Sequence, residues 1–176
     1  MHSGDFTMSG SEAETLDFLE WVCALPYRHK VLVAGNHDAS LYGGHLDGLD
    51  DNVHYLCGSR VEIEGLKFWG VPMFMEDCVS GNQEQLYAAI PDDTDVLVTH
   101  TPPYGILDRD GSILYGSREL HEIVCTIRPR LHLFGHIHKS HGTTNDGMTV
   151  FSNAAIMDEG YDSLNGPNVL PISNEQ

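Results

Sequence analysis

The apolar positions of this chain fall into short continuous runs, which predict buried strands. Such runs lie at residues 30–34, 53–56, 95–99 and 131–134. Continuous apolar runs of this length are typical of parallel strands that are covered on both faces. Three of the four are closed by a glycine or a polar residue, so we expect each strand to end in a functional loop.

Three segments between these runs have the spacing and the end signals of helices. Ser11 and Glu14 form a capping box, which predicts a helix over 12–25 that ends at Pro26. A short helix is expected over 83–90. Ser117 is placed to cap a third helix, which runs to about residue 127.

Two hairpins complete the predicted architecture. Residues 60–63 and 66–71 flank Glu64-Gly65, and residues 143–144 and 148–152 flank Asn145-Asp146-Gly147, which is a strong turn signal. Residues 39–52 are interpreted as a loop, and the tail after Asp158 is expected to wrap the surface. Strands that alternate with helices, together with hairpins, predict an α/β domain with mixed sheets. In such domains, ligands bind beyond the carboxyl ends of the strands.

Composition narrows the class of partner. The 176 residues suffice for one domain with a core. A net charge of −17 argues against binding along a nucleic-acid backbone, which needs clustered cations, although it allows a small anionic ester that a bound cation attracts. No apolar run is long enough to span a bilayer, and we see no signal peptide. The four scattered cysteines are read as reduced thiols, so we expect a cytoplasmic protein.

Side chains that bind metals or transfer protons follow the predicted strands. Asp5 offers a carboxylate that can bridge two cations, Asn36 an amide oxygen, and His100 and His136 imidazole nitrogens; His138 lies two residues further on. This mixed set of nitrogen and oxygen ligands is typical of a site for manganese, iron or zinc, and it differs from the cysteine-rich set of a structural zinc site. Glycines precede several of these residues and permit tight turns. Taken together, these residues predict a divalent-metal site.

Two neighbouring residues are candidates for acid catalysis. A protonated His37, beside Asn36, could donate to a leaving group, with Asp38 orienting its ring or holding its charge. Each candidate also has an ordinary structural explanation: Asp5 as a turn residue, Asn36 as loop chemistry, His100 at a strand end. Their coincidence in chain order favours the metal site. Tyr104 and Arg109 are weaker candidates for substrate contact. The other histidines are given structural roles: His2, His29, His45, His54, His121, His132 (in the core) and His141.

These motifs together resemble the ordered motifs of the calcineurin-like metallophosphoesterases. Gly4-Asp5, Gly35-Asn36-His37-Asp38, His100 and Gly135-His136-Ile137-His138 carry the resemblance. Residues 99–105, 128–138, 145–147 and 151–154 are also similar to the small metallophosphoesterase-domain proteins related to the fetal-brain phosphodiesterase group. The similarity runs from about residue 4 to residue 172.

The resemblance implies a four-layer α/β/β/α sandwich with a two-metal site on one edge. It implies that Asp5 bridges both divalent ions and that Asn36, His100 and His136 hold the second, while His138 reaches the first. It further implies that His37 is the acid, with Asp38 behind it. A metal-bridging hydroxide would attack the phosphorus.

One family motif is missing. The family opens with a strand that ends in D-x-H, whose two ligands bind the first metal, and this sequence has no such motif. We therefore expect residues 1–176 to be a single phosphoesterase domain, incomplete at the N-terminus, with a depleted first metal site. The expected function is hydrolysis of a small phosphate ester or nucleotide, with a phosphodiester preferred. The alternative is a catalytically impaired protein that binds one metal or a nucleotide.

Overall fold

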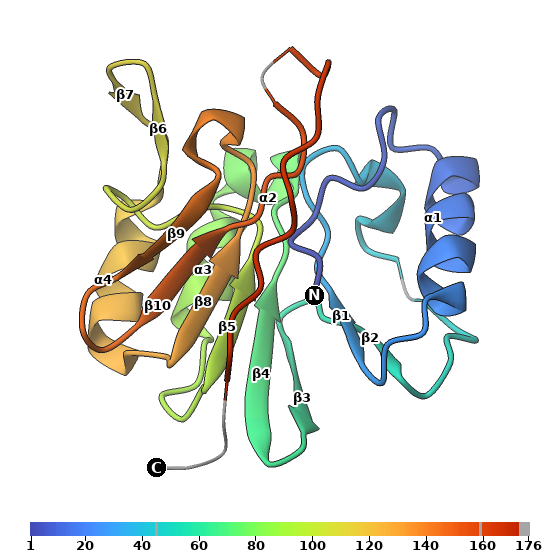
Figure 1. The fold of residues 1–176 in the computed structure, drawn as a ribbon, viewed down its shortest axis with the longest axis horizontal. Coiled ribbons are helices and arrows are strands. Elements are labelled where there is room, and N and C mark those ends of the chain that lie inside the picture. The colour runs from blue at the N-terminus through green and yellow to red at the C-terminus, as the bar shows by residue number, and fades with distance from the viewer. Residues whose placement is uncertain (45, 159, 173–176) are drawn as a thin grey trace.

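Two β-sheets form the centre of the molecule (Figure 1). The structure is a computed structural model that describes residues 1–44, 46–158 and 160–172. A small parallel sheet consists of β1 (Lys30–Leu32) and β2 (Val53–Tyr55). A mixed six-stranded sheet has the order β3-β4-β5-β8-β10-β9. Its strands are β3 (Ser59–Ile63), β4 (Leu66–Val71), β5 (Val96–Thr99), β8 (Leu131–Phe134), β9 (Gly142–Asn145) and β10 (Val150–Asn153).

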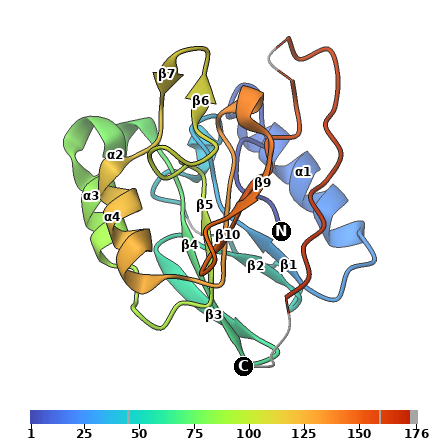
Figure 2. The same cartoon turned by 60° about the vertical axis from the view of Figure 1, so that its left-hand side comes forward.

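The side chains of the central strands alternate between two buried faces, and this alternation produces four layers. Val96 and Val98 of β5 face the small sheet, whereas Leu97 faces the helices α3 (Asn82–Ala88) and α4 (Arg118–Ile127). In the small sheet, Val31 faces the larger sheet and Leu32 packs under α1 (Glu12–Ala24). Successive residues of a strand point to opposite faces, so both sheets are covered on both sides. Figures 1 and 2 show the resulting α/β/β/α order, which confirms the predicted fold.

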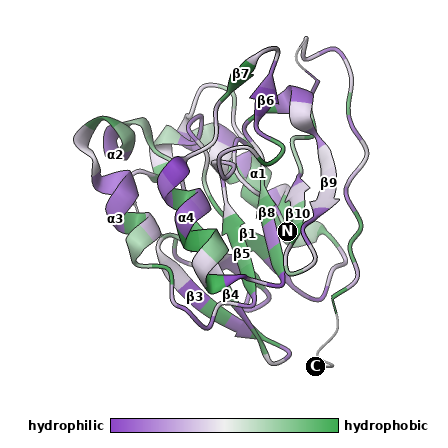
Figure 3. Cartoon of the chain, turned by 90° about the vertical axis from the view of Figure 1, so that its left-hand side faces the viewer, coloured by the Kyte–Doolittle hydropathy of each residue, from purple (hydrophilic) through white to green (hydrophobic). Residues whose placement is uncertain are grey.

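The predicted helix signals form as expected. The Ser11 side chain accepts a hydrogen bond from the Glu14 N–H, and the Glu14 side chain reaches back to the Ser11 backbone. The Oγ atom of Ser117 accepts from the N–H of Leu120 at 3.0 Å and caps α4. In Figure 3, α4 shows both hydrophobic and hydrophilic residues, whereas β5 is mainly hydrophobic. The helix therefore buries one face, and β5 is buried on both.

Both predicted hairpins are present, but three short elements were not predicted. The pairs β3–β4 and β9–β10 are antiparallel, with the expected turns. The missed elements are helix α2 (Met75–Ser80) and a small hairpin of β6 (Arg109–Asp110) and β7 (Ile113–Leu114). Helix α2 has no side-chain cap, and two-residue strands are too short to establish a period. The predicted loop after residue 38 contains a 3-10 turn, η1 (Ala39–Leu41).

The tail after β10 does more than wrap the surface. Leu170 and Ile172 are partly buried against the apolar cluster between the two sheets, while Val169 is 88% exposed. This alternation resembles that of a strand, although the segment pairs with neither sheet in ladder fashion. In Figure 1 it runs down between the two sheets. The tail therefore closes part of the space between the layers.

Each described helix is too short or too polar to cross a bilayer. All four cysteines are free thiols.

Candidate metal centre

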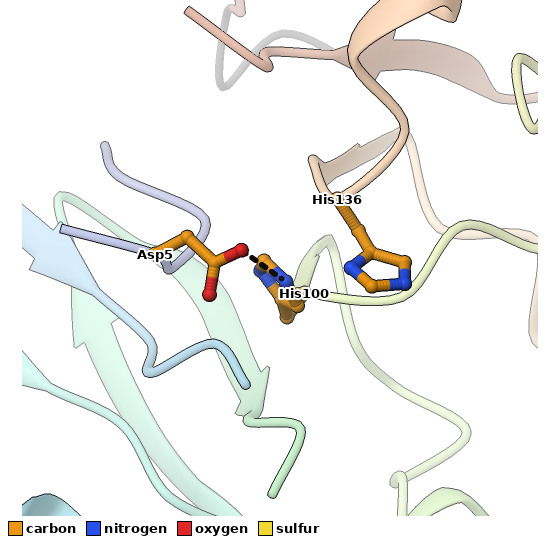
Figure 4. A group of neighbouring side chains, drawn as sticks. All are labelled: Asp5, His100 and His136. Carbon is orange, nitrogen blue, oxygen red and sulfur yellow. Dashed lines mark ion pairs between the residues drawn. The ribbon is translucent and has the colours of Figure 1, made fainter. Parts of the chain in front are cut away.

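Four predicted ligand residues follow strands that end at one edge of the sandwich. Residue 2 makes a parallel bridge to Leu32, so the first residues extend the small sheet and deliver Asp5 to this edge. Asn36 follows β1, His100 follows β5, and His136 follows β8. Parallel strands end side by side, which is why residues distant in sequence meet here. Figure 4 shows Asp5, His100 and His136 gathered together.

His100 is the centre of this group, and it is 1% exposed. Its Nδ1 atom lies 2.7 Å from the carbonyl oxygen of Ser3, which can only accept a hydrogen bond. In the neutral ring the proton is therefore on Nδ1 and Nε2 presents a lone pair, whereas in the protonated ring Nε2 donates a second hydrogen bond. That Nε2 lies 3.1 Å from Oδ1 of Asn36 and 3.2 Å from Oδ2 of Asp5.

Three lone-pair donors thus converge on one point. Without a positive charge between them they would repel, and that charge is either a proton on Nε2, which gives the ion pair with Asp5, or a bound cation. His136 adds a fourth donor: the ligand atoms of Asp5, His100 and His136 all lie within 4.8 Å of one another. The ring centroids of His100 and His136 are 5.0 Å apart. This mixed oxygen and nitrogen set fits a divalent transition metal.

The ionisation of these groups also suits a metal. Burial and, to a smaller extent, nearby His100 together lower the pKa of His136 to about 4, so the ring is neutral at pH 7. Burial alone would raise the pKa of Asp5, but hydrogen bonding and charge from His100, with the His37 N–H, lower it to about 2. The site therefore offers an ionised carboxylate and an unprotonated imidazole.

The backbone is strained where the ligands enter. Asp5 has φ 58° and His136 has φ 68°, a left-handed conformation that is uncommon for residues with a side chain. Gly35 lies in the middle of the cluster. A Cβ atom there would lie 2.2 Å from Oδ1 of Asp5 and 2.6 Å from Cε1 of His100. Strain of this kind concentrates at functional sites, where the surrounding structure maintains it.

Asp38 has a different set of partners from the one predicted. We expected it behind the ring of His37. Instead, its Oδ2 accepts from the N–H groups of Asp5 and Gly35, both at 2.8 Å. Its Oδ1 accepts from the N–H of Phe6 at 3.1 Å and from the N–H and hydroxyl of Thr7 at 3.0 and 2.9 Å. Burial raises the pKa of Asp38, although these hydrogen bonds oppose the rise. The carboxylate therefore orders the backbone around Asp5.

His37 lies beside the cluster with its ring in a cleft. Its Nδ1 atom is 3.1 Å from the carbonyl oxygen of Met8, and its backbone N–H donates to Oδ1 of Asp5 at 2.9 Å. The cleft has a volume of about 230 Å³, and Asp5, His37 and His138 contribute to its lining. The structure thus places the predicted acid next to the predicted metal ligand.

His138 also lines this cleft, at the start of the 3-10 turn η2 (His138–Ser140). Its Nδ1 atom is 3.2 Å from the carbonyl oxygen of Asp158. It does not belong to the cluster of Asp5, His100 and His136 within the described part of the chain. The structure therefore separates it from the ligands predicted to hold the second metal.

The weaker candidates have partners of their own. The guanidinium of Arg118 lies 3.7 Å from the ring centroid of Tyr104. The backbone of Arg109 exchanges two hydrogen bonds with the Ser140 hydroxyl, at 3.0 and 2.8 Å. These contacts join the β6–β7 hairpin to the turn that carries His138.

Sequence reasoning missed one residue that supports the site. Asn153, at the end of β10, is fully buried, and its Nδ2 donates to the carbonyl oxygens of Leu107 and Ile137, both at 2.9 Å. Ile137 lies between His136 and His138, so Asn153 fixes the loop that carries both. The place of Asn153 directly after the predicted strand at residues 148–152 was the available signal.

The fold and the cluster define a metal-binding α/β/β/α sandwich with its site at the strand ends. A family model described as Metallophos, calcineurin-like phosphoesterase, matches residues 1–140, so the chain belongs to that family. The family is one of metal-dependent hydrolases of phosphate esters.

Relatives extend the match beyond residue 140. A UPF0046 protein of Caenorhabditis elegans is 37% identical over 98% of this chain and 67% of its own length. The metallophosphoesterase domain-containing protein 1 of Homo sapiens is 28% identical over 98% of this chain and 64% of its own length. The chain thus spans about two thirds of these relatives. One solved structure has a TM-score of 0.61 at 16% identity, and covers 81% of this chain and 63% of its own, which supports the fold alone.

Proposed function

We propose that this chain acts as a metal-dependent phosphodiesterase on a small phosphate ester, with manganese as the metal. The observation that carries the proposal is the convergence of Asp5, Asn36 and His100 on one point, with His136 beside them. A structural role would require only a pair of hydrogen-bonded side chains, and not a cluster of carboxylate, amide and two imidazole groups at the ends of separate strands. A metal-binding role would require such a cluster.

In this proposal one set of residues binds the metal, and a different residue, His37, donates a proton. Asp5, Asn36, His100 and His136 would hold the metal, and His138 would contact a second ion or the ester. Divalent cations bound here would activate water and neutralise charge on the phosphate oxygens. The carbonyl oxygen of Met8 fixes a proton on Nδ1 of His37, so a protonated ring carries its second proton on Nε2. That proton would go to the departing ester oxygen.

The experiment is manganese-stimulated hydrolysis of bis(p-nitrophenyl) phosphate. Replacing His100 by Asn removes the central ligand, and we expect kcat/KM to fall by about 10²-fold or more, as for loss of other catalytic electrostatic groups. The matched control is His121→Asn, on helix α4, which should retain wild-type activity. Undiminished manganese-dependent turnover in the His100 variant would refute the site assignment.

A second candidate is a protein that binds a single metal without efficient turnover. The described residues form a single group of three candidate metal ligands, which favours it, because a two-metal site needs ligands on both sides of the bridging carboxylate. Metal stoichiometry by calorimetry separates the two functions. Two bound ions with hydrolysis support the enzyme, and one bound ion without hydrolysis supports the binding protein.

A further inference from the structure

The cleft beside the metal cluster is lined by side chains of two kinds. Asp5, Thr7, His37 and His138 supply polar groups, and Phe6, Met8, Met157 and Tyr161 supply apolar surface, which we call the apolar wall. Met8 is 64% exposed and Tyr161 50% exposed, although large apolar side chains are usually buried. Apolar side chains exposed next to a polar site are typical of a ligand-binding surface.

The apolar wall is held in place before any ligand binds. Tyr161 lies at the tip of a loop that follows β10, and its N–H donates to the carbonyl oxygen of Asp158 at 3.2 Å. The side-chain Oδ1 atom of Asp158 accepts a hydrogen bond from the N–H of Asp162 at 2.9 Å. Met157 pairs with Leu164 across the loop. In Figure 1 this loop rises beyond the strand ends.

Tyr161 is also connected directly to the metal side of the cleft. Its ring meets the His138 ring edge-on, with centroids 5.2 Å apart and an interplanar angle of 73°. The ring of Phe6, which also lines the cleft, stacks on that of Phe18 with centroids 4.2 Å apart, and this contact fixes the segment that carries Met8. Thioether and aromatic groups both make favourable contacts with a flat ring.

The side chains that line the cleft disfavour a second anionic group on the substrate. Of its described lining residues, none is Lys or Arg. A further phosphate, or the backbone of a nucleic acid, would find no lysine or arginine there, and the chain carries a net charge of −17. An uncharged ring attached to the reacting phosphate needs no lysine or arginine to neutralise it.

We propose that this cleft binds an aromatic, uncharged ester group of the substrate, and that Tyr161 and Met157 determine this preference. The inference rests on the proposed function, because the phosphate must lie at the metal cluster for its ester group to reach this wall. It adds the chemical class of the group that the phosphate carries. The reaction itself is unchanged.

The test compares two phosphate monoesters, phenyl phosphate and methyl phosphate, by calorimetry in the presence of manganese. Both place the same anion at the cluster, so the ratio of their affinities isolates the contribution of the ring. We expect phenyl phosphate to bind about tenfold more tightly, given the apolar area that a ring buries. Tyr161→Ala should reduce the ratio to about two, leaving the affinity for methyl phosphate unchanged, and Tyr161→Phe should preserve it.

The matched control is Tyr27→Ala, since Tyr27 is 64% exposed and is not part of the cleft lining. An unchanged ratio in Tyr161→Ala, or equal affinities in the wild-type protein, would overturn the inference while leaving the proposed function intact. If neither ester binds in the presence of manganese, both proposals are wrong. Reduced affinity for both esters to the same extent would assign Tyr161 to loop structure instead.

Discussion

The edge and the interior of the six-stranded sheet each bury a histidine, and the two side chains have opposite surroundings. His100, at the edge, is 1% exposed, and its Nε2 faces two oxygen acceptors. His132, in the middle of β8, is fully buried, and its Nε2 lies 2.9 Å from the hydroxyl of Thr99. That hydroxyl donates to the carbonyl oxygen of Thr101 at 2.6 Å, so it accepts from His132.

Burial alone therefore does not identify a metal ligand. His132 donates one hydrogen bond among apolar neighbours, and its Nδ1 has no partner among the described residues. His100 instead uses Nδ1 to fix its ring and leaves Nε2 free for a cation. The two histidines differ in how many oxygen atoms face the ring nitrogen: two face Nε2 of His100, whereas one hydroxyl faces Nε2 of His132.

The largest expected effect is stabilisation by metal. With free manganese at about 1,000 times its dissociation constant, the free energy of unfolding should rise by about 4 kcal/mol, and a chelator should remove the rise. We expect His100→Asn to abolish this shift, because it removes the central ligand. Urea titrations with and without manganese measure it.

The contrasting variant is His132→Leu, which removes the interior histidine. Thr99 keeps its acceptor in Thr101, so no buried hydroxyl is left unsatisfied. This variant should keep the full stabilisation by manganese. Equal losses in both variants would mean that the edge and the interior do not differ as described.

The second-largest expected effect is a loss of folding stability at acid pH, which the buried side chain of His132 causes. Burial lowers its pKa from 6.5 to about 3 in the folded protein, so the unfolded chain binds a proton first as the pH falls. Stability from this group is therefore complete above pH 6.5 and is lost progressively down to about pH 3. Between pH 7 and pH 4 the loss is about 3 kcal/mol. Urea titrations of metal-free protein across this range should show a shallower dependence for His132→Leu.

A subtraction isolates this contribution. Burial also lowers the pKa of His2 and of His136, each to about 4, and both histidines remain in the variant. The difference between the wild-type and variant curves therefore belongs to His132. Parallel curves would contradict the interior assignment.

The contrast between the two histidines could be predicted from the sequence, because it depends on position relative to a strand. His132 lies inside an apolar run, and His100 follows one. Parallel strands then require the ends to meet, so Asp5, Asn36, His100 and His136 could be grouped. Main elements were also predictable, since their caps, turns and apolar runs are local signals.

What could not be predicted depends on the geometry between loops. No local pattern reveals that Asp38 accepts hydrogen bonds from Asp5, Phe6 and Thr7, since those partners are about 30 residues away. The same holds for Asn153, whose partners Leu107 and Ile137 lie in two other loops. Tertiary hydrogen bonds of this kind appear only when the strand ends have been placed.

Asp38→Asn tests whether the edge depends on this support. Each carboxylate oxygen of Asp38 accepts from two backbone N–H groups. In asparagine an NH₂ group takes the place of one oxygen, so two of these N–H groups lose their acceptor. We expect a loss of about 2 kcal/mol in the free energy of unfolding, and a fall of about 10- to 100-fold in manganese affinity. Urea titration and calorimetry measure the two effects. Unchanged manganese affinity would show that Asp5 holds its position without Asp38.

The smallest effect comes from a residue that belongs to neither region. Ser117 caps α4, on the face of the sheet opposite the small sheet, and its Oγ accepts only from the Leu120 N–H among the described backbone donors. Ser117→Ala should lower the free energy of unfolding by about 1 kcal/mol, because one helix N–H loses its acceptor. The increment produced by manganese should be the same as in the wild type, since distant effects add. A reduced increment in this variant would mean that general loss of stability weakens metal binding, and the losses in the edge variants could then no longer be attributed to the ligands.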